Sequence, residues 1–408
     1  MKKLLFVFVA LMVYSGGNLI AQADCSGGRY LDSLFSVDVT NDIVYGHNYN
    51  YLGIYSTLKM DVYQPHGDVA EKRPLIIIAP GGSFIFEDKQ DYTTVTLCEK
   101  FASLGYVTVG MDYRVGVSLP TQAQFRTALY RATHDMRAVV RYFKQDAATV
   151  NTYKVDTSII IVGGSSAGAI TALHVGYLDK ISEILSQDID TTGMGGVEGL
   201  SGNQGYSSKV NYIVNLCGAL GDTIFLEPGD IPVISMHGTN DNTVPYASGS
   251  ALSIVPVDGS ATIKIRADHV GVQNPFYSFI GADHVPYDSG SNATSYILYM
   301  DTTFTFIRDN LYNWICSGYT DINENNLPAS ITVSPNPFTD YTEIYSSLPL
   351  QNASLEIFDI TGKEVFQLNN INDNRIIIHR SGMPAGIYFY KLSGQNKKPV
   401  SSGKLAIQ

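Results

Sequence analysis

The stretch from Ser158 to Gly168 decides the fold and reads Ser-Ile-Ile-Ile-Val-Gly-Gly-Ser-Ser-Ala-Gly. Its first half is an apolar run typical of a buried strand, and its second half fits Gly-x-Ser-x-Gly with Ser166 at the centre. A helical pattern begins at Ala167. We therefore predict a sharp strand-to-helix turn that places the Ser166 hydroxyl at a helix N-terminus, where partial positive charge favours a developing anion. The alternative is a glycine-rich turn without chemistry.

Further apolar runs on both sides of this stretch are predicted to be buried strands, and helical patterns separate them. The runs span residues 75–79, 107–111, 158–162, 212–216, 233–236 and 276–280, and one long helical pattern covers residues 122–146. Because strands and helices alternate, we predict the α/β fold class, with a mostly parallel central sheet and helices on both faces. The alternating runs near 43–45 and 58–63 are expected to form an antiparallel edge.

A serine nucleophile needs a base, and the base needs an orienting acid. In folds whose nucleophile lies in such a strand-to-helix turn, called an elbow, the three residues follow along the chain in the order Ser, then Asp or Glu, then His. Asp241 comes after the predicted strand 233–236, at a strand end where ligand sites of open α/β sheets gather. We predict Asp241 as the acid, with His237 packed beneath its loop.

Two nearly identical segments, residues 267–270 and 282–285, each offer a histidine as the base. His284 follows the predicted strand 276–280 directly, with a glycine as the turn. His269 instead follows a charged, alternating run at 262–266. We therefore predict His284 as the base, and we interpret His269 and the remaining histidines as structural or surface residues.

The carbonyl oxyanion of an acyl-transfer reaction also needs donors. The backbone N–H of Ala167, directly after the predicted nucleophile, is one candidate. Others are expected from the loop Pro80-Gly81-Gly82-Ser83-Phe84, which follows the predicted strand 75–79. Small residues there allow backbone N–H groups to approach a substrate closely. The alternative is an ordinary glycine turn.

Together these residues resemble the carboxylesterase and lipase branch of the α/β-hydrolase fold, over roughly residues 36–316. Further marks of the resemblance are residues 58–65, 112–114 and 135–138. Similar esterases carry His-Gly-Gly-Gly at the oxyanion loop, whereas this chain has Pro80 in the first position and Ser83 in the fourth. The resemblance implies that Gly82 and Ser83 supply the donating N–H groups.

What the resemblance implies chemically is a two-step ester hydrolysis by Ser166, His284 and Asp241, with no metal and no organic cofactor. The expected substrate is a small or polymer-attached ester, such as a sugar acetyl, feruloyl, short-chain or polyester group. Two other functions stay open, namely a serine peptidase on the same fold and a surface-binding protein with a silent hydrolase fold. The glycine-rich segment 193–202 is predicted either as a flexible wall of the pocket or as a plain surface loop.

The C-terminal region, about 328–408, resembles the sorting domain of proteins exported by the type IX system of Bacteroidetes. The matching pieces are residues 334–338, 358–363, 386–388 and 403–407. Short strands and polar turns predict a small all-β sandwich there. The resemblance implies the secretion machinery as a partner. The competing interpretation is a carbohydrate-binding or adhesion module, which would need exposed aromatic residues such as Tyr388, Phe389 and Tyr390.

The predicted organisation is a signal peptide over residues 1–23, a catalytic domain over 24–319, a linker over 320–328 and the sandwich over 329–408. Two lysines, a short apolar stretch and an Ala-Gln-Ala cleavage pattern predict the signal peptide and thus a secreted or cell-surface location. No later segment holds about 18 uninterrupted apolar residues, so we expect no stable membrane insertion.

The net charge limits the kinds of partner that the chain can bind, and the cysteine content indicates which disulfides it can form. The formal net charge of −11 disfavours nucleic acid as a partner. An exported chain meets an oxidising compartment, where its four cysteines can pair. A bridge between Cys25 and Cys316 would join the two ends of the catalytic region, and Cys98 with Cys217 would then form a second bridge. Buried free thiols are the alternative.

Overall fold

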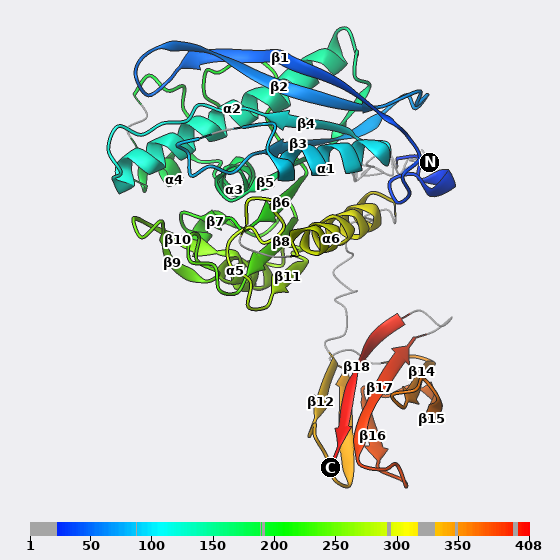
Figure 1. Cartoon of the computed structure of the whole chain (residues 1–408). Coiled ribbons are helices and arrows are strands. Elements are labelled where there is room, and N and C mark those ends of the chain that lie inside the picture. The colour runs from blue at the N-terminus through cyan, green and yellow to red at the C-terminus, as the bar shows by residue number, and fades with distance from the viewer. Residues whose placement is uncertain are drawn as a thin grey trace, which may run out of the picture. The chain divides into compact units, whose positions relative to one another are not determined.

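The computed structural model describes residues 23–86, 88–187, 189, 192–291, 295–316, 331–346, 350–394 and 399–408. The chain divides into two compact units, with the division between residues 318 and 319 (Figure 1). Each unit is described by itself below. The predicted linker over 320–328 lies outside the described residues, as does the predicted signal peptide except for its last residue.

The larger unit is built on an eight-stranded sheet with the order β1-β2-β4-β3-β5-β6-β8-β11. All neighbours from β4 to β11 are parallel, whereas β1–β2 and β2–β4 are antiparallel. The mostly parallel sheet with an antiparallel edge is thus confirmed. The strands are β1 (Val37–Tyr49), β2 (Tyr55–Pro65), β3 (Arg73–Ala79), β4 (Val107–Met111), β5 (Val155–Ser165), β6 (Tyr212–Leu216), β8 (Val233–Gly238) and β11 (Phe276–Phe279).

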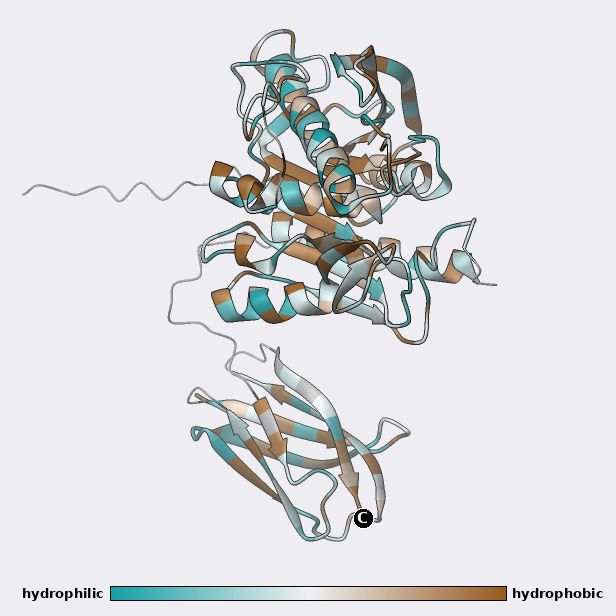
Figure 2. Cartoon of the chain, turned by 90° about the vertical axis from the view of Figure 1, so that its left-hand side faces the viewer, coloured by the Kyte–Doolittle hydropathy of each residue, from teal (hydrophilic) through white to brown (hydrophobic). Residues whose placement is uncertain are grey.

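Helices cover both faces of this sheet, as predicted. In β3, Leu75 and Ile77 pack in one apolar cluster with residues of α2 and α3, while Ile76 and Ile78 pack in another with residues of α1 and α6. Figure 2 shows the resulting apolar strands inside the unit. The helices are α1 (Tyr92–Ser103), α2 (Gln122–Ala148), α3 (Ala167–Tyr177), α4 (Ile181–Leu185), α5 (Ser260–Val270) and α6 (Tyr296–Cys316), with short 3₁₀ turns η1 (Ser26–Gly28) and η2 (Thr223–Phe225). Within the described ranges, no helix combines the length and apolarity needed to cross a membrane.

A second, small sheet lies beside the acid loop and consists of β7 (Ala219–Leu220), β10 (Val255–Gly259) and β9 (Ser248–Ala251). The alternating run at 262–266, which follows β10, belongs to α5. Its charged residues Lys264 and Arg266 are half-buried on the helix, whereas Ile263 and Ala267, four residues apart, occupy buried positions. His269 is exposed in the last turn of α5.

The cysteine prediction is half right. Cys25 and Cys316 form a disulfide that joins the start of the described chain to the end of α6. Cys98 and Cys217, however, are buried free thiols. Cys98 lies on α1, which packs mainly on β2 and β4, whereas Cys217 follows β6. Because β3 and β5 separate β4 from β6, the sheet spacing keeps the two thiols about 10 Å or more apart, beyond the reach of a disulfide.

The smaller unit consists of two antiparallel sheets around one apolar core, which confirms the predicted all-β domain. Alternate residues such as Leu355 and Ile357 in one sheet and Ile376 and Ile378 in the other point into this core. One sheet contains β12 (Ile331–Ser334), β13 (Tyr341–Ser346) and β16 (Arg375–His379); the other contains β15 (Glu364–Ile371), β14 (Ala353–Phe358), β17 (Gly386–Ser393) and β18 (Pro399–Ile407).

Candidate active site

Ser166 lies in a strained turn between β5 and α3. Its φ of 54° and ψ of −118° are outside the regions that a non-glycine residue normally occupies. The neighbouring strand β6 stabilises the turn, since the Ser166 N–H donates to Leu216 O at 2.8 Å. A Cβ at Gly164 or Gly168 would collide with the carbonyl oxygen of Ala79 in β3. Both glycines of the motif are therefore needed to seat the elbow against the neighbouring strand.

The structure brings Ser166, His284 and Asp241 together. His284 Nε2 lies 2.8 Å from Ser166 Oγ, and His284 Nδ1 lies 2.6 Å from Asp241 Oδ2. The loops that carry the histidine and the acid follow β11 and β8, which are adjacent parallel strands, so they meet at one edge of the sheet. Asp283 supports the histidine loop, because its Oδ1 accepts from the His284 N–H at 2.8 Å. His269, on α5, is not part of this arrangement.

Asp241 is a buried carboxylate surrounded by donors. Its Oδ1 accepts the N–H groups of Thr243 and Val244, each at 2.9 Å. Its Oδ2 faces both His284 and, at 3.1 Å, Nε2 of His237. Burial alone would raise the pKa of Asp241, but the hydrogen bonds from the two histidines lower it well below its ordinary value. Asp241 is therefore ionised at neutral pH.

The loop after β3 carries Gly82 and Ser83, the residues predicted to donate to an oxyanion. Gly82, Ser83 and Phe84 have φ values of 115°, 58° and 59°, so three successive residues are left-handed. This turn leaves the N–H groups of Gly82 and Ser83, like that of Ala167 at the first position of α3, without a hydrogen-bond acceptor among the described residues. Such N–H groups beside a nucleophile can stabilise an oxyanion.

One residue that the sequence did not single out holds this loop in place. Tyr113 is buried after β4, and its hydroxyl donates to Pro80 O at 3.0 Å and lies 3.3 Å from Gly81 O. The only feature of the sequence that could have pointed to a role for Tyr113 was its place in the segment 112–114, which follows a core strand. The hydroxyl thus fixes the start of the loop whose later N–H groups lie beside Ser166.

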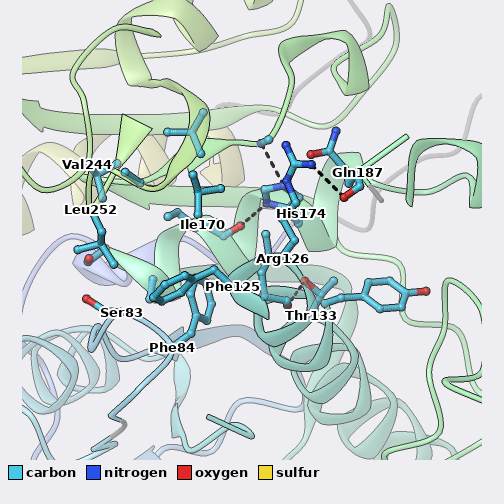
Figure 3. A pocket seen from close by; sticks show the side chains of 18 of the residues that line it. Ser83, Phe84, Phe125, Arg126, Thr133, Ile170, His174, Gln187, Val244 and Leu252 are labelled. Carbon is cyan, nitrogen blue, oxygen red and sulfur yellow. Dashed lines mark hydrogen bonds between the residues drawn. The ribbon is translucent and has the colours of Figure 1, made fainter. Parts of the chain in front are cut away.

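Two cavities meet at Ser166, and both are also lined by Ser83 and Thr243. The first is apolar and extends along α3 toward α2 and the β9–β10 hairpin. Figure 3 shows Ser83 at one end, Ile170 and Phe125 in the middle, and Gln187 at the far end. Other apolar side chains complete the wall, among them Leu129, Ala251, Leu252, Val255 and Val257. None of these residues carried a sequence signal that distinguishes a cavity wall from an ordinary core.

The second cavity is polar and contains His284. Asp88, Asp91 and Asp288 line it, together with Thr93, whose hydroxyl donates to Asp288 Oδ2 at 2.5 Å. Burial and the neighbouring carboxylates raise the pKa of Asp91 to about 6, against hydrogen bonds from α1 that lower it. This side of Ser166 is therefore rich in hydrogen-bond acceptors.

The glycine-rich segment 193–202 is not a flexible pocket wall. None of its residues, all of which are described, lines either cavity. Buried arginines of α2 bind its carbonyls instead: Arg137 contacts Val197 O, and Arg141 donates to Gly202 O at 2.9 Å. These arginines of α2 thus anchor the segment 193–202.

A metal would have one conceivable place among the described residues. Ligand atoms of Cys217, His237 and Asp241 lie within 4.8 Å of one another, and all three residues are buried. Burial, with a smaller effect of Asp241, raises the pKa of the Cys217 thiol to about 12, which disfavours the thiolate that a metal needs. Both oxygens of Asp241 already accept hydrogen bonds, so the donor set does not fit a metal ion.

A serine at a strand-to-helix turn, a loop of open N–H groups, an acid and a histidine lie at the carboxyl edge of a mostly parallel sheet, which is the arrangement of the α/β-hydrolase fold. Residues 60–221 match the profile of the BD-FAE family. Residues 332–408 match the Secretion system C-terminal sorting domain. The larger unit therefore has an esterase-like α/β-hydrolase fold, and the chain ends in a type IX sorting domain, which makes it a secreted or cell-surface protein.

Solved structures similar to this chain include esterase 2 of Thermogutta terrifontis. The form phosphorylated by paraoxon is 22% identical, with a TM-score of 0.47, and the match covers 68% of this chain and 94% of that chain. The butyrate-bound form is 20% identical, with a TM-score of 0.48 and coverages of 68% and 93%. No curated protein matches the chain.

The sorting-domain match replaces the interpretation of the smaller unit as a carbohydrate-binding or adhesion module. Its proposed aromatic platform is also missing from β17. Tyr388 and Tyr390 are each only 6% exposed and belong to the core, and Phe389 alone faces solvent in that strand's aromatic triplet. Successive residues of a strand point to opposite faces, so three adjacent aromatics cannot share one surface.

Proposed function

We propose that this protein is a secreted serine carboxylesterase that hydrolyses carboxylic esters through an acyl-enzyme on Ser166. The observation that carries the proposal is the continuous chain of hydrogen-bond distances from Ser166 Oγ through His284 to Asp241. In the first step His284 takes the hydroxyl proton while the Ser166 oxygen attacks the ester carbonyl. The oxyanion is bound by the N–H groups of Gly82, Ser83 and Ala167.

Collapse of this intermediate breaks the bond to the alcohol oxygen, and His284 gives its proton to the leaving alcohol. Water then attacks the acyl-enzyme with His284 again as base, which releases the acid and restores Ser166. Asp241 orients His284 and stabilises its charged form throughout. No step needs a metal or an organic cofactor.

The two cavities are proposed to bind the two halves of the ester. His284 must reach the alcohol oxygen to protonate it, so the alcohol belongs in the polar cavity that His284 lines. The acyl chain then belongs in the apolar cavity, which begins at Ser166 and does not include His284. A hydrophobic acyl group is thus preferred over acetate, since each buried methylene contributes about 0.8 kcal/mol.

A labelling experiment tests the nucleophile. A fluorophosphonate probe should modify Ser166, identified by peptide mass spectrometry, and Ser166→Ala should lose about three to six decades of kcat. Ser165→Ala is the matched control, because Ser165 Oγ is bound to Tyr287 OH at 3.0 Å, and this variant should still be labelled at Ser166. A Ser166→Ala variant with near-full esterase activity contradicts the proposal.

A panel of p-nitrophenyl esters from acetate to octanoate tests the acyl cavity. Ala251→Phe fills the apolar wall, so kcat/KM should fall about ten-fold or more for the longer acyl groups and little for acetate. Peptide amides in the same panel separate the esterase from a serine peptidase. A uniform loss across all acyl lengths would assign the acyl group elsewhere.

The sorting domain is proposed to be dispensable for catalysis and required for export. All residues proposed for catalysis lie in the larger unit. A chain from Asp24 to Asp321 should therefore keep kcat/KM on soluble esters but no longer be exported by a type IX host. Retention of the isolated 328–408 region on insoluble polysaccharide, with the mature protein still carrying it, would instead indicate a binding role.

A further inference from the structure

We infer that His237 is a positioning residue of the ester-hydrolysis site, acting through Asp241. His237 is the last residue but one of β8 and is fully buried. Its Nε2 lies 3.1 Å from Asp241 Oδ2, the same oxygen that His284 contacts from the other side. The acid is therefore held between two imidazoles, only one of which reaches Ser166. This inference rests on the proposed function.

The proton on His237 can be assigned from its neighbours. Nε2 faces Asp241 Oδ2 and, also at 3.1 Å, the carbonyl oxygen of Val244, which are both acceptors. Nε2 must therefore carry a hydrogen and donate it. On the other side of the ring, Nδ1 lies 2.7 Å from the hydroxyl of Ser260. A hydroxyl can donate to Nδ1, which completes a neutral tautomer with its N–H directed at the acid.

The network continues into the sheet. Asn215, buried in β6, donates through Nδ2 to Ser260 Oγ at 3.0 Å, and its Oδ1 accepts the Gly218 N–H at 2.9 Å. Asn215, Ser260 and His237 are each 0% exposed. A buried chain thus runs from β6 through the first residue of α5 and β8 to the acid. Because every step is buried, each partner restricts the orientation of the next.

Two consequences for His284 follow from this geometry. The second donor fixes the Oδ2 atom that must meet His284 Nδ1, so its loss lets the carboxylate rotate and lowers kcat. The donor also withdraws charge from the carboxylate, so its loss leaves more negative charge facing the His284 imidazolium. A purely structural role would reduce the amount of folded enzyme without changing how the rate of the remaining folded enzyme depends on pH.

The ionisable groups around the two histidines are few in the described structure. Cys217 lies beside Asp241 and, with its raised pKa, stays a neutral thiol. Tyr246 packs edge-on against the His237 ring, with ring centroids 5.7 Å apart. Around His284 the acidic neighbours besides Asp241 are Asp283, in its own loop, and Asp88, Asp91 and Asp288, in the polar cavity. These groups are the same in wild type and in the variants proposed below, so their effects on the pH profile cancel when the profiles are compared.

The test compares His237→Met, which removes the donor at similar volume, with His237→Gln, whose amide can place an N–H near the Nε2 position. Rates are normalised to active sites titrated with a fluorophosphonate. For His237→Met we expect kcat to fall about 10–100-fold with KM little changed, as for loss of other supporting hydrogen bonds. The acid limb of kcat/KM should move up by about 0.5–1 pH unit. His237→Gln should recover part of both effects.

Two controls make the result decisive. His134→Met removes another buried imidazole, which is bound to Gly196 O at 2.8 Å and lines neither cavity, and should leave the acid limb unmoved. In an Asp241→Asn background, His237→Met should cause no further loss of kcat, since both changes remove the same link.

Several outcomes would overturn the inference. One is an unchanged kcat and acid limb in His237→Met. Another is full additivity with Asp241→Asn. A third is loss of wild-type activity on chelation that zinc restores, which would make His237 a metal ligand. If Ser166→Ala itself stays active, the proposed function fails instead, so the two failures are distinguishable.

Discussion

His174 gives the protein a defined sensitivity to acid. It lies on α3, two turns after Ser166, in the wall of the apolar cavity, and it is 3% exposed. Its Nδ1 donates to Ile170 O at 2.7 Å, and its Nε2 accepts the Gly221 N–H at 3.2 Å. Both nitrogens are used in the neutral form, and a protonated ring would direct a second N–H against a donor. Burial lowers the pKa of His174 to about 4.

The sign and size of the effect follow by linkage. Because the folded pKa lies below the unfolded value of 6.5, the contribution of His174 is fully present above that value and is lost as pH falls toward 4. At pH 5 the unfolded histidine is almost fully protonated and the folded one is mostly neutral. The free energy of unfolding should therefore be about 2 kcal/mol lower at pH 5 than at about pH 7.5 because of this residue alone.

Urea unfolding of wild type and His174→Gln at these two pH values measures the effect. Glutamine does not titrate, and its amide oxygen can still accept from Gly221. The variant should lose about 2 kcal/mol less than wild type between the two conditions. His269→Gln, on the exposed face of α5, should lose as much as wild type. If His174→Gln loses as much stability as wild type does, His174 is not a buried neutral histidine and the reasoning is refuted.

Other expectations concern the base, the disulfide and the polar cavity. His284→Ala should lower kcat by at least about three decades while His269→Ala leaves it unchanged, and the reverse ranking in ester assays would make His269 the base. Replacing Cys25 and Cys316 by serine should lower the free energy of unfolding, measured in urea, by up to about 6 kcal/mol in the chain-entropy treatment, since the sequence separation of the two cysteines is 291 residues. The pKa of Asp91 is raised to about 6, so its contribution to the free energy of unfolding is present below about pH 4 and is lost as pH rises through 6. Asp91→Asn keeps the α1 cap, and its free energy of unfolding relative to that of wild type should be higher at pH 8 than at pH 4 by at most about 3 kcal/mol. The same relative stability at both pH values would contradict the argument that burial raises the pKa of Asp91.

The sequence could predict that Ser166, Asp241 and His284 lie close together, because each of them belongs to a locally defined segment. Ser166 lies in a five-residue motif between a strand and a helix. Asp241 and His284 each follow an apolar strand within a few residues, and parallel strands bring such loops to one edge. The choice between His269 and His284 depended on the strand before the second histidine, and β11 ends five residues before it.

The cavities and the second thiol pair could not be predicted in this way. Phe125, Ile170 and Leu252 come from α2, α3 and the turn between β9 and β10, and each has the pattern of an ordinary core position. A cavity arises from what the packing leaves unfilled, which a hydrophobic pattern does not encode. The pairing of Cys98 with Cys217 could not be judged from the sequence either. An even number of cysteines permits disulfides, but it does not tell how far apart two cysteines lie in the fold.

Chemistry and substrate choice are carried by separable parts of the larger unit. The proposed catalytic groups follow β3, β5, β8 and β11, and sheet hydrogen bonds fix the strands that precede them. The apolar cavity is instead walled by α2, between β4 and β5, and by the β9–β10 hairpin, between the acid and the histidine. Residues 245–259 can therefore change in length or bulk without moving Asp241, whose Oδ1 is fixed by N–H groups only two and three residues ahead. We expect substitutions in the hairpin to alter the preferred acyl group, whereas substitutions that disturb the loop 239–244 should lower kcat for every ester.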